Sequence, residues 1–284
     1  MKHHSTAIAA LIAAFTAWSG FTAGSGRAEQ LPLWEAGLGV AAISFPDYRG
    51  SNERQNWVLP YPYIVYRGDF LQADGRRVRG LFFKTGRLEL DVSVNGSVPV
   101  NSNENDARRG MPDLDATLEI GPALNVLLMQ SDNRKTRLEL RLPVRAVLAS
   151  DFSHVRQVGW VFQPHVNVDV ADPLGFEGWN LGLLAGPLMT DRRYNRYFYA
   201  VEPPFATANR PAYSAGGGYA GTQLIAALSK RYRKFWVGGF VKWDTLNGAA
   251  FADSPLVKDK QGVAAGFSIA WVIGESETRV ETTR

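Results

Sequence analysis

The sequence contains no cysteine. This absence excludes disulfide-stapled scaffolds, thiol nucleophiles and zinc sites built on cysteine, and it is compatible with an oxidising compartment. Charged residues are also scarce, because they make up 20% of the chain, against about 25% in soluble domains. A mean hydropathy of -0.16 excludes a polytopic helical membrane protein, which needs several runs of about 20 apolar residues.

The charge of the chain has no strong sign. The 284 residues carry 31 basic and 27 acidic side chains, for a formal net charge of +4. An excess this small, spread over so many charges, is not the basic patch that nucleic-acid binding requires. We therefore expect no nucleic-acid partner.

The length allows one large all-β domain or two ordinary domains.

The first 28 residues have the three-part layout of a secretory signal peptide. A short basic start precedes an apolar run over 7–17, and Gly26-Arg27-Ala28 offers a small-x-small cleavage site. The alternative is a membrane anchor, although the apolar run is short for one. We predict a signal peptide over 1–28 and a single domain over 29–284.

Apolar and polar side chains alternate over long stretches of this domain. For example, Leu138 and Leu140 alternate with Arg137, Glu139 and Arg141. A strand places successive side chains on opposite faces, so a period of two predicts half-buried strands. The stretches with this period are 87–95, 114–120, 137–148 and 158–170. We therefore predict an all-β fold.

Three features favour a transmembrane antiparallel up-and-down β-barrel of about 12 strands. The alternating runs are as long as the ~9–11 residues that a tilted strand needs to cross a bilayer. Their polar faces carry both signs of charge, as a wet lumen would, while apolar faces would meet lipid. Aromatic residues near the ends of the runs suit two interfacial girdles; they are Trp34, Trp57, Tyr61, Tyr63, Trp160, Trp179, Trp243 and Trp271. A soluble lipocalin-like barrel with reversed faces is the structural rival.

The connections between the predicted strands alternate in length. The strands are predicted over 34–45, 55–66, 70–74, 77–83, 87–96, 114–129, 136–149, 157–171, 178–190, 220–230, 235–246 and 261–273. The connections at one end of the predicted barrel are mostly long loops, and those at the other end are short turns. This asymmetry is typical of bacterial outer-membrane barrels. The segment 70–83 could also be one bent strand. Pro60 and Pro62 each lack a ladder donor, so we expect a bulge or a distorted seam there.

The first long loop contains Pro46, Asp47, Tyr48, Gly50 and Ser51. Proline fixes φ, aspartate can cap its own turn and glycine can take a positive φ, so the loop is built to turn tightly. A structural role and a role in recognition are both open. With the Gly37-Leu38-Gly39 and Leu59-Pro60-Tyr61-Pro62-Tyr63 stretches around it, this Pro-Asp-Tyr-x-Gly-Ser sequence resembles the signature of the MipA/OmpV family of outer-membrane proteins.

The resemblance implies a barrel in the outer membrane of a Gram-negative bacterium. It also implies a scaffold that joins the lytic transglycosylase MltA to a penicillin-binding murein synthase, whereas other members are linked to adhesion or permeability. The sequence departs from such barrels at its end, because a charged tail, 274–284, follows the last predicted strand. Barrel-assembly recognition commonly reads an aromatic residue there.

The domain offers little that could carry catalysis. Only His154 and His165 follow the predicted cleavage site, and His165, Asn167 and Asp169 share one face of a strand. Outer-membrane phospholipases use a Ser-His-Asn set, but here the common face follows from the period of two. We expect no enzyme activity, no cofactor and no metal. A lipid hydrolase would need a serine within reach of His165.

Charges on the predicted inner faces lead to a further expectation. Arg137, Glu139, Arg141 and Arg145 should lie opposite Asp115 and Glu119 on the preceding strand, in pairs that each stabilise the sheet by roughly 0.2–1 kcal/mol. Such pairs could largely fill the lumen. We therefore expect a narrow or occluded pore rather than a general porin, although a channel for small solutes is the alternative function.

Two basic segments are candidate binding surfaces. Arg192, Arg193, Arg196 and Arg210 lie in the longest outer loop, among Tyr194, Tyr197, Phe198 and Tyr199. They could bind lipopolysaccharide phosphate or mediate adhesion, or the loop could simply fold over the barrel mouth. At the other end, one short turn contains Lys230, Arg231, Arg233 and Lys234. This turn could hold anionic outer-membrane lipid or dock an acidic partner.

Overall fold

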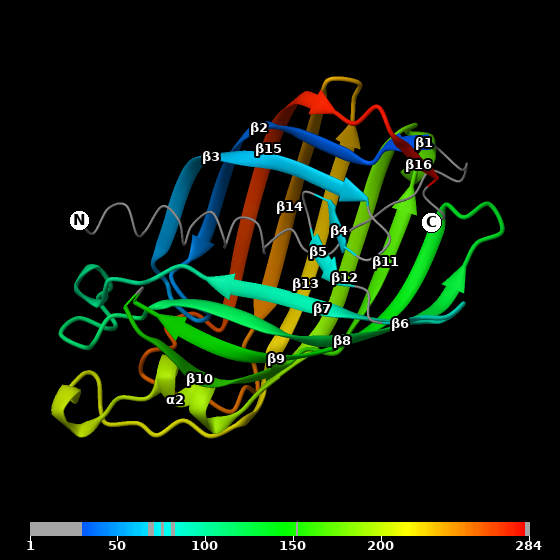
Figure 1. Cartoon of the computed structure of the whole chain (residues 1–284). Coiled ribbons are helices and arrows are strands. Elements are labelled where there is room, and N and C mark those ends of the chain that lie inside the picture. The colour runs from blue at the N-terminus through cyan, green and yellow to red at the C-terminus, as the bar shows by residue number, and fades with distance from the viewer. Residues whose placement is uncertain (1–29, 68–70, 75–76, 81–82, 152, 282–284) are drawn as a thin grey trace.

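A computed structural model describes residues 30–67, 71–74, 77–80, 83–151 and 153–281. One large antiparallel sheet curls into a barrel (Figure 1), in the order β5-β4-β3-β2-β15-β14-β13-β12-β10-β9-β8-β7-β6, with β11 between β12 and β9. Its strands are β2 (Trp34–Pro46), β3 (Arg54–Arg67), β4 (Leu71–Asp74), β5 (Arg77–Gly80), β6 (Phe83–Lys84), β7 (Leu88–Ser97), β8 (Ala116–Gln130), β9 (Thr136–Ser150), β10 (Val155–Phe162), β11 (His165–Ala171), β12 (Trp179–Thr190), β13 (Gly218–Arg231), β14 (Phe235–Thr245) and β15 (Gln261–Glu275). The last wall strand, β15, pairs with the first, β2.

The two faces of the wall differ as the alternation predicts. Leu88 is 40% exposed on the outer face, whereas its neighbour Glu89 is 8% exposed on the inner face. Val58 and Ile273 are each 73% exposed on the outside. Backbone groups in hydrocarbon have no water to bond, so strands that cross a bilayer must pair with one another. The prediction of a transmembrane antiparallel β-barrel is confirmed, and the lipocalin-like arrangement is excluded.

Both ends of the described chain lie at the end of the barrel that carries the short turns (Figure 1). There β1 (Gln30–Pro32) pairs with β16 (Arg279–Glu281) outside the wall. The segment predicted as a charged tail therefore begins within β15, which extends to Glu275, and continues into β16. In outer-membrane barrels the short turns face the periplasm and the long loops face outward, and we use these names for the two ends.

One predicted strand is divided. The segment 157–171 forms β10 and β11, which are interrupted at Gln163–Pro164, because proline cannot donate to the ladder. A register shift between Gln157 and Gly159 also reverses the alternation. As a result Val158, expected on the lipid face, is 5% exposed and packs inside.

The bulge expected at Pro60 and Pro62 does not occur in the pairing of β3 with β2, whereas the alternative, a distorted seam, fits the other edge of β3. These two strands pair from Arg54 to Arg67 without a register shift. Within the described residues, the other edge of β3 pairs with β4 only at Tyr66 and Arg67. Because the prolines lie on this otherwise unpaired edge strand, a missing ladder donor is tolerated.

In the described residues, helices are few and short. The α-helix α2 spans Arg192–Tyr199, and 3-10 turns span Ser102–Glu104, Pro173–Gly175 and Pro203–Phe205. The sequence pattern did not predict α2. Its N-cap is Asp191, whose side chain accepts a hydrogen bond from the Tyr194 backbone N–H. Among the described residues, no helix is both long and apolar enough to span a bilayer.

Candidate functional site

The long loops form an apolar core at the outer end of the barrel, which we call the plug. Loop and helix side chains, among them Tyr48, Leu114, Tyr199 and Phe251, pack against inward-facing wall residues such as Val147. Tyr199 is 1% exposed, and its ring stacks on Phe251 with centroids 3.7 Å apart. Leu114, expected on the lipid face, is buried here and bridges to Val100.

The first loop lies at the centre of the plug. The Tyr48 hydroxyl donates to the Leu256 carbonyl oxygen (2.8 Å), and burial raises the pKa of this phenol, so it stays a donor. The Arg49 guanidinium donates twice to the Asp244 carboxylate on β14, at 2.6 and 2.7 Å. The Tyr199 hydroxyl donates to the Arg49 carbonyl oxygen (3.0 Å). The loop is thereby joined to the wall and to α2.

Other residues of this loop hold the neighbouring loops. The Asn105 side-chain amide donates to Asp47 (2.8 Å) and to the Ser51 hydroxyl (3.2 Å). Gly50 has φ +95, and a Cβ there would lie 2.9 Å from Leu246, so glycine is required. With Tyr48, Gly50 and Ser51 buried, these contacts favour the structural interpretation of the Pro46–Ser51 sequence over direct recognition.

The sequence pattern did not predict that Arg49 and Asp244 form a pair. Arg49 fills the variable position of the signature, and Asp244 lies 195 residues away. The only local signal was an aspartate at an inward position near the end of a predicted strand. Burial opposes the charge of Arg49, but Asp244 outweighs burial and raises the pKa of the guanidinium.

Helix α2 covers one side of the plug with an aromatic face. Tyr194, Phe198 and Tyr199 point into the core, whereas Arg192, Arg193 and Arg196 are exposed. Beneath the helix, a Cβ at Gly159 would lie 2.5 Å from the Tyr194 backbone nitrogen, so only glycine lets β10 and α2 approach so closely. The aromatic and arginine residues of this segment thus have separate roles.

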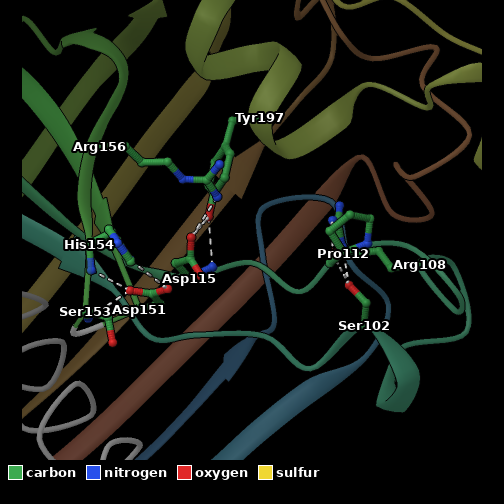
Figure 2. Close-up of polar contacts among 9 residues, drawn as sticks. All are labelled: Ser102, Arg108, Pro112, Asp115, Asp151, Ser153, His154, Arg156 and Tyr197. Atoms are coloured by element: carbon green, nitrogen blue, oxygen red, sulfur yellow. Dashed lines mark hydrogen bonds and ion pairs between the residues drawn. The ribbon is translucent and has the colours of Figure 1, made fainter.

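Polar contacts join α2 to the neighbouring loops (Figure 2). The Tyr197 hydroxyl accepts a hydrogen bond from the Asp115 backbone N–H (2.8 Å), and Arg156 donates to the Asp115 carboxylate (2.8 Å). Burial and Asp115 raise the pKa of Tyr197 to about 12. Arg108 is buried and donates to the Ser102 hydroxyl and to the Phe198 carbonyl oxygen, each at 3.1 Å.

Arg210 belongs to this framework and not to a free basic surface. It donates to the carbonyl oxygens of Ala107, Arg109 and Phe205. The exposed basic set predicted for this loop is therefore reduced to Arg192, Arg193 and Arg196.

A chain of hydrogen-bonded side chains lies below the plug. Arg145 donates to Glu119 (2.8 Å) and to Gln163 (2.7 Å), Gln163 donates to Gln223 (3.0 Å), and Gln223 donates to Asp244 (3.3 Å). The chain links β8 and β9 to β14 within the lumen. Together with the plug, it favours the predicted narrow or occluded pore.

The other predicted charge pairs are different. Arg137 and Arg141 both donate to Glu139 on their own strand, at 2.7 and 2.6 Å, and not to β8. The register explains the difference, because Gln130 lies opposite Arg137 and Asn125 lies opposite Arg141. Asp115 lies in the plug instead.

One part of the inner face is apolar, which the alternation did not predict. Tyr63, Leu184, Trp236 and Phe240 belong to a second buried cluster, which lies toward the periplasmic end. The Tyr63 and Trp236 rings lie 6.4 Å apart. Tyr61 shares the inner face and contacts the Ser268 hydroxyl. The placement of Tyr61 and Tyr63 in a lipid-facing girdle is therefore wrong, while Trp34, Trp160 and Trp271 are 41–50% exposed on the outer face.

His165, Asn167 and Asp169, which share one face of β11, have contacts with residues close to them in the sequence. His165 Nδ1 lies 2.8 Å from the Gln163 carbonyl oxygen, and the Asn167 amide donates to Asp169 (2.7 Å). His154 is exposed in a turn that Asp151 caps, since this carboxylate accepts the backbone N–H groups of Ser153 and His154 (Figure 2). No group of three or more His, Cys, Asp or Glu side chains that could hold a metal occurs in the described part of the chain.

At the periplasmic end, Arg231 is not part of a free basic turn. Its guanidinium donates to Glu35 (2.8 Å), which also accepts from Arg67 (2.8 Å). Glu35 is 2% exposed, so this ion triad joins β2, β3 and β13 internally. Arg233 and Lys234 are exposed, and Lys230 donates to the Glu177 carbonyl oxygen (2.8 Å).

The Lys230–Glu177 contact places two short turns side by side. The turn before β12 exposes Leu174 by 96% and Phe176 by 62%. Leu174 has φ +55, a strained backbone conformation for a leucine. We call the surface formed by the two turns the periplasmic patch; it comprises Leu174, Phe176, Lys230, Tyr232, Arg233 and Lys234. The sequence pattern did not predict the apolar part of the periplasmic patch, although two large apolar residues in a short turn were a signal for it.

A family model described as "MltA-interacting protein MipA" matches residues 38–273. No curated protein matches the chain in sequence. Among solved structures, a bacterial polysaccharide outer membrane secretin is 9% identical with a TM-score of 0.42, and the alignment covers 84% of this chain and 99% of that one. The NanC porin is 8% identical with a TM-score of 0.40, covering 83% and 100%. The toluene transporter TodX of P. putida is 12% identical with a TM-score of 0.28, covering 95% and 76%.

Proposed function

The chain belongs to the MltA-interacting protein MipA family and is an outer-membrane β-barrel protein, and from this premise we propose that it is a non-enzymatic scaffold for murein-remodelling enzymes. The scaffold holds a lytic transglycosylase of the MltA type, together with a penicillin-binding murein synthase, at the periplasmic face of the outer membrane. The family description names the first of these partners. The observation that carries the proposal is the periplasmic patch.

The patch has the composition of a docking surface. Adjacent exposed apolar side chains can mark an interaction site, and here Leu174 and Phe176 are exposed by 96% and 62% on one turn. Arg233 and Lys234 would add long-range attraction to an acidic partner.

The alternative is a narrow channel or an adhesion protein. The plug and the hydrogen-bonded side chains from Glu119 to Asp244 would obstruct a path through the lumen. A channel would need these contacts to open, whereas a scaffold would not. We therefore favour the scaffold.

Changing the apolar part of the patch should abolish capture of the transglycosylase. We expect Leu174→Asp with Phe176→Asp to weaken binding by at least about thirtyfold, because two apolar anchors contribute roughly 2 kcal/mol or more. Arg233→Gln with Lys234→Gln should weaken it less and reduce its salt dependence. Binding is measured by pulldown and by surface plasmon resonance with purified MltA-type enzyme.

The matched control is Lys258→Gln with Lys260→Gln, which removes two exposed charges at the outer end. Arg231 is kept in every variant, because its loss would remove one of the two arginines that pair with the buried Glu35. Retention of full-strength capture by the folded Leu174 and Phe176 variant, as judged by heat-modifiable migration, would contradict the proposed docking surface.

A further inference from the structure

The outward face of α2 carries three arginines that the plug does not use. Arg192, Arg193 and Arg196 are exposed, whereas the opposite face is buried in aromatic packing. Arg196 pairs with Glu202 at 3.0 Å, with both side chains more than half exposed. Within the described part of the chain, Arg192 and Arg193 have no carboxylate partner. The face therefore has an excess of positive charge.

The Asp191 carboxylate binds backbone groups and not these arginines. Its Oδ1 accepts the backbone N–H of Tyr194 (2.9 Å) and that of Trp160 (3.1 Å). The carboxylate is thus engaged in capping the helix and in joining it to β10. Because α2 is fixed by its core face and by β10, the backbone that carries the three arginines is held in place.

The join to β10 also sets the height of the helix relative to the bilayer. The Asp191 backbone N–H donates to the Trp160 carbonyl oxygen (3.2 Å). Trp160 is 47% exposed on the lipid face, with Phe162 and Met189 nearby on paired strands at 37% and 39%. Aromatic girdles of outer-membrane barrels lie at the boundary between acyl chains and headgroups. Asp191, the residue before Arg192, therefore lies at the level of Trp160 on the wall.

We propose that the outward face of α2 binds the phosphorylated headgroup of an outer-leaflet lipid. Guanidinium groups pair with phosphate through two parallel N–H···O bonds, which favours arginine over lysine at such sites. The acyl chains of the same molecule would lie against Trp160, Phe162 and Met189. A lipid satisfies the cationic and the apolar parts of this surface together, which free phosphate cannot do.

The test uses the folded full-length barrel in detergent, with bisphosphorylated lipid A as probe and native mass spectrometry as readout. We expect Arg192→Gln, Arg193→Gln and Arg196→Gln together to raise the dissociation constant at least about tenfold. The variant with lysine at all three positions should recover only part of the affinity. Lysine keeps the positive charge but cannot donate the two parallel hydrogen bonds of a guanidinium group. Lipid A without phosphate should bind both proteins equally weakly.

The control variant, Arg109→Gln with Lys258→Gln and Lys260→Gln, removes three outer-loop charges away from α2. Equal lipid retention by wild type and the α2 variant would overturn the proposal, as would an equal loss in the control. Complete displacement of the lipid by millimolar inorganic phosphate would also overturn it, because the site would then be one for soluble phosphate. Neither result bears on the periplasmic patch, so the two proposals fail separately.

Discussion

Replacing Arg49 with methionine should loosen the plug and increase ion conductance through the barrel. The guanidinium donates twice to Asp244, and Asp244 is 8% exposed. Loss of one partner of a buried ion pair typically costs about 3–5 kcal/mol, of which Gln223 and Lys242, which also interact with Asp244, would offset a part. Asp244 is also the last member of the hydrogen-bonded network of side chains that begins at Glu119. Loss of Arg49 should therefore disturb this network within the lumen as well.

Planar-bilayer recordings measure this effect. Wild type should show low, steady conductance, and Arg49→Met should show larger and fluctuating openings together with a lower midpoint in heat-modifiability gels. Arg54→Met is the control, because Arg54 lies nearby but exposed, with one hydrogen bond to Ser44 (3.1 Å). A large wild-type conductance would argue against the occluded pore and in favour of the channel hypothesis.

A double variant separates the lost ion pair from the lost side chain. Replacing both partners of a buried pair by apolar residues is often close to neutral. The unfolding midpoint in heat-modifiability gels should therefore be higher for Arg49→Met with Asp244→Leu than for Arg49→Met alone, and close to that of wild type. If the double variant is less stable than either single variant, the ion pair is not the source of the effect.

The faces of the wall strands could be predicted because their cause is local. Each strand between lipid and a polar lumen must alternate, so Leu88 and Glu89 reveal their faces without knowledge of any partner. The same rule fails where the structure breaks it locally. The bulge after Gln157 moves Val158 inside, and no side chain near it announces the shift.

Contacts between strands that are distant in the sequence could not be predicted for a different reason. Glu35 and Arg231 are 196 residues apart, and they meet only because β15 and β14 bring β2 and β13 close together. The apolar cluster around Tyr63 and Trp236 likewise depends on which walls face each other across the lumen. Alternation states that a side chain points inward, but it does not state what the side chain meets there.

Tyr199→Ala should be among the most destabilising single changes in the plug, and Tyr199→Phe should be mild. Tyr199 stacks on Phe251, lies edge-on to Tyr48 at 6.4 Å and is 1% exposed. Removal of such a buried aromatic side chain costs about 3–5 kcal/mol. Phenylalanine keeps the stack and loses only the hydrogen bond to the Arg49 carbonyl, which contributes about 1 kcal/mol.

Limited trypsin digestion measures this difference directly, because Arg192, Arg193 and Arg196 precede Tyr199 on the same helix. Local opening of the plug exposes these sites, so Tyr199→Ala should be nicked between 191 and 217 much faster than Tyr199→Phe or wild type. Tyr232→Ala is the control, because Tyr232 also stacks on a phenylalanine, Phe235, but is 36% exposed at the opposite end. Equal cleavage of Tyr199→Ala and wild type would mean that α2 is held by the wall and not by the aromatic core. The first loop would then not be what joins the outer loops into one unit.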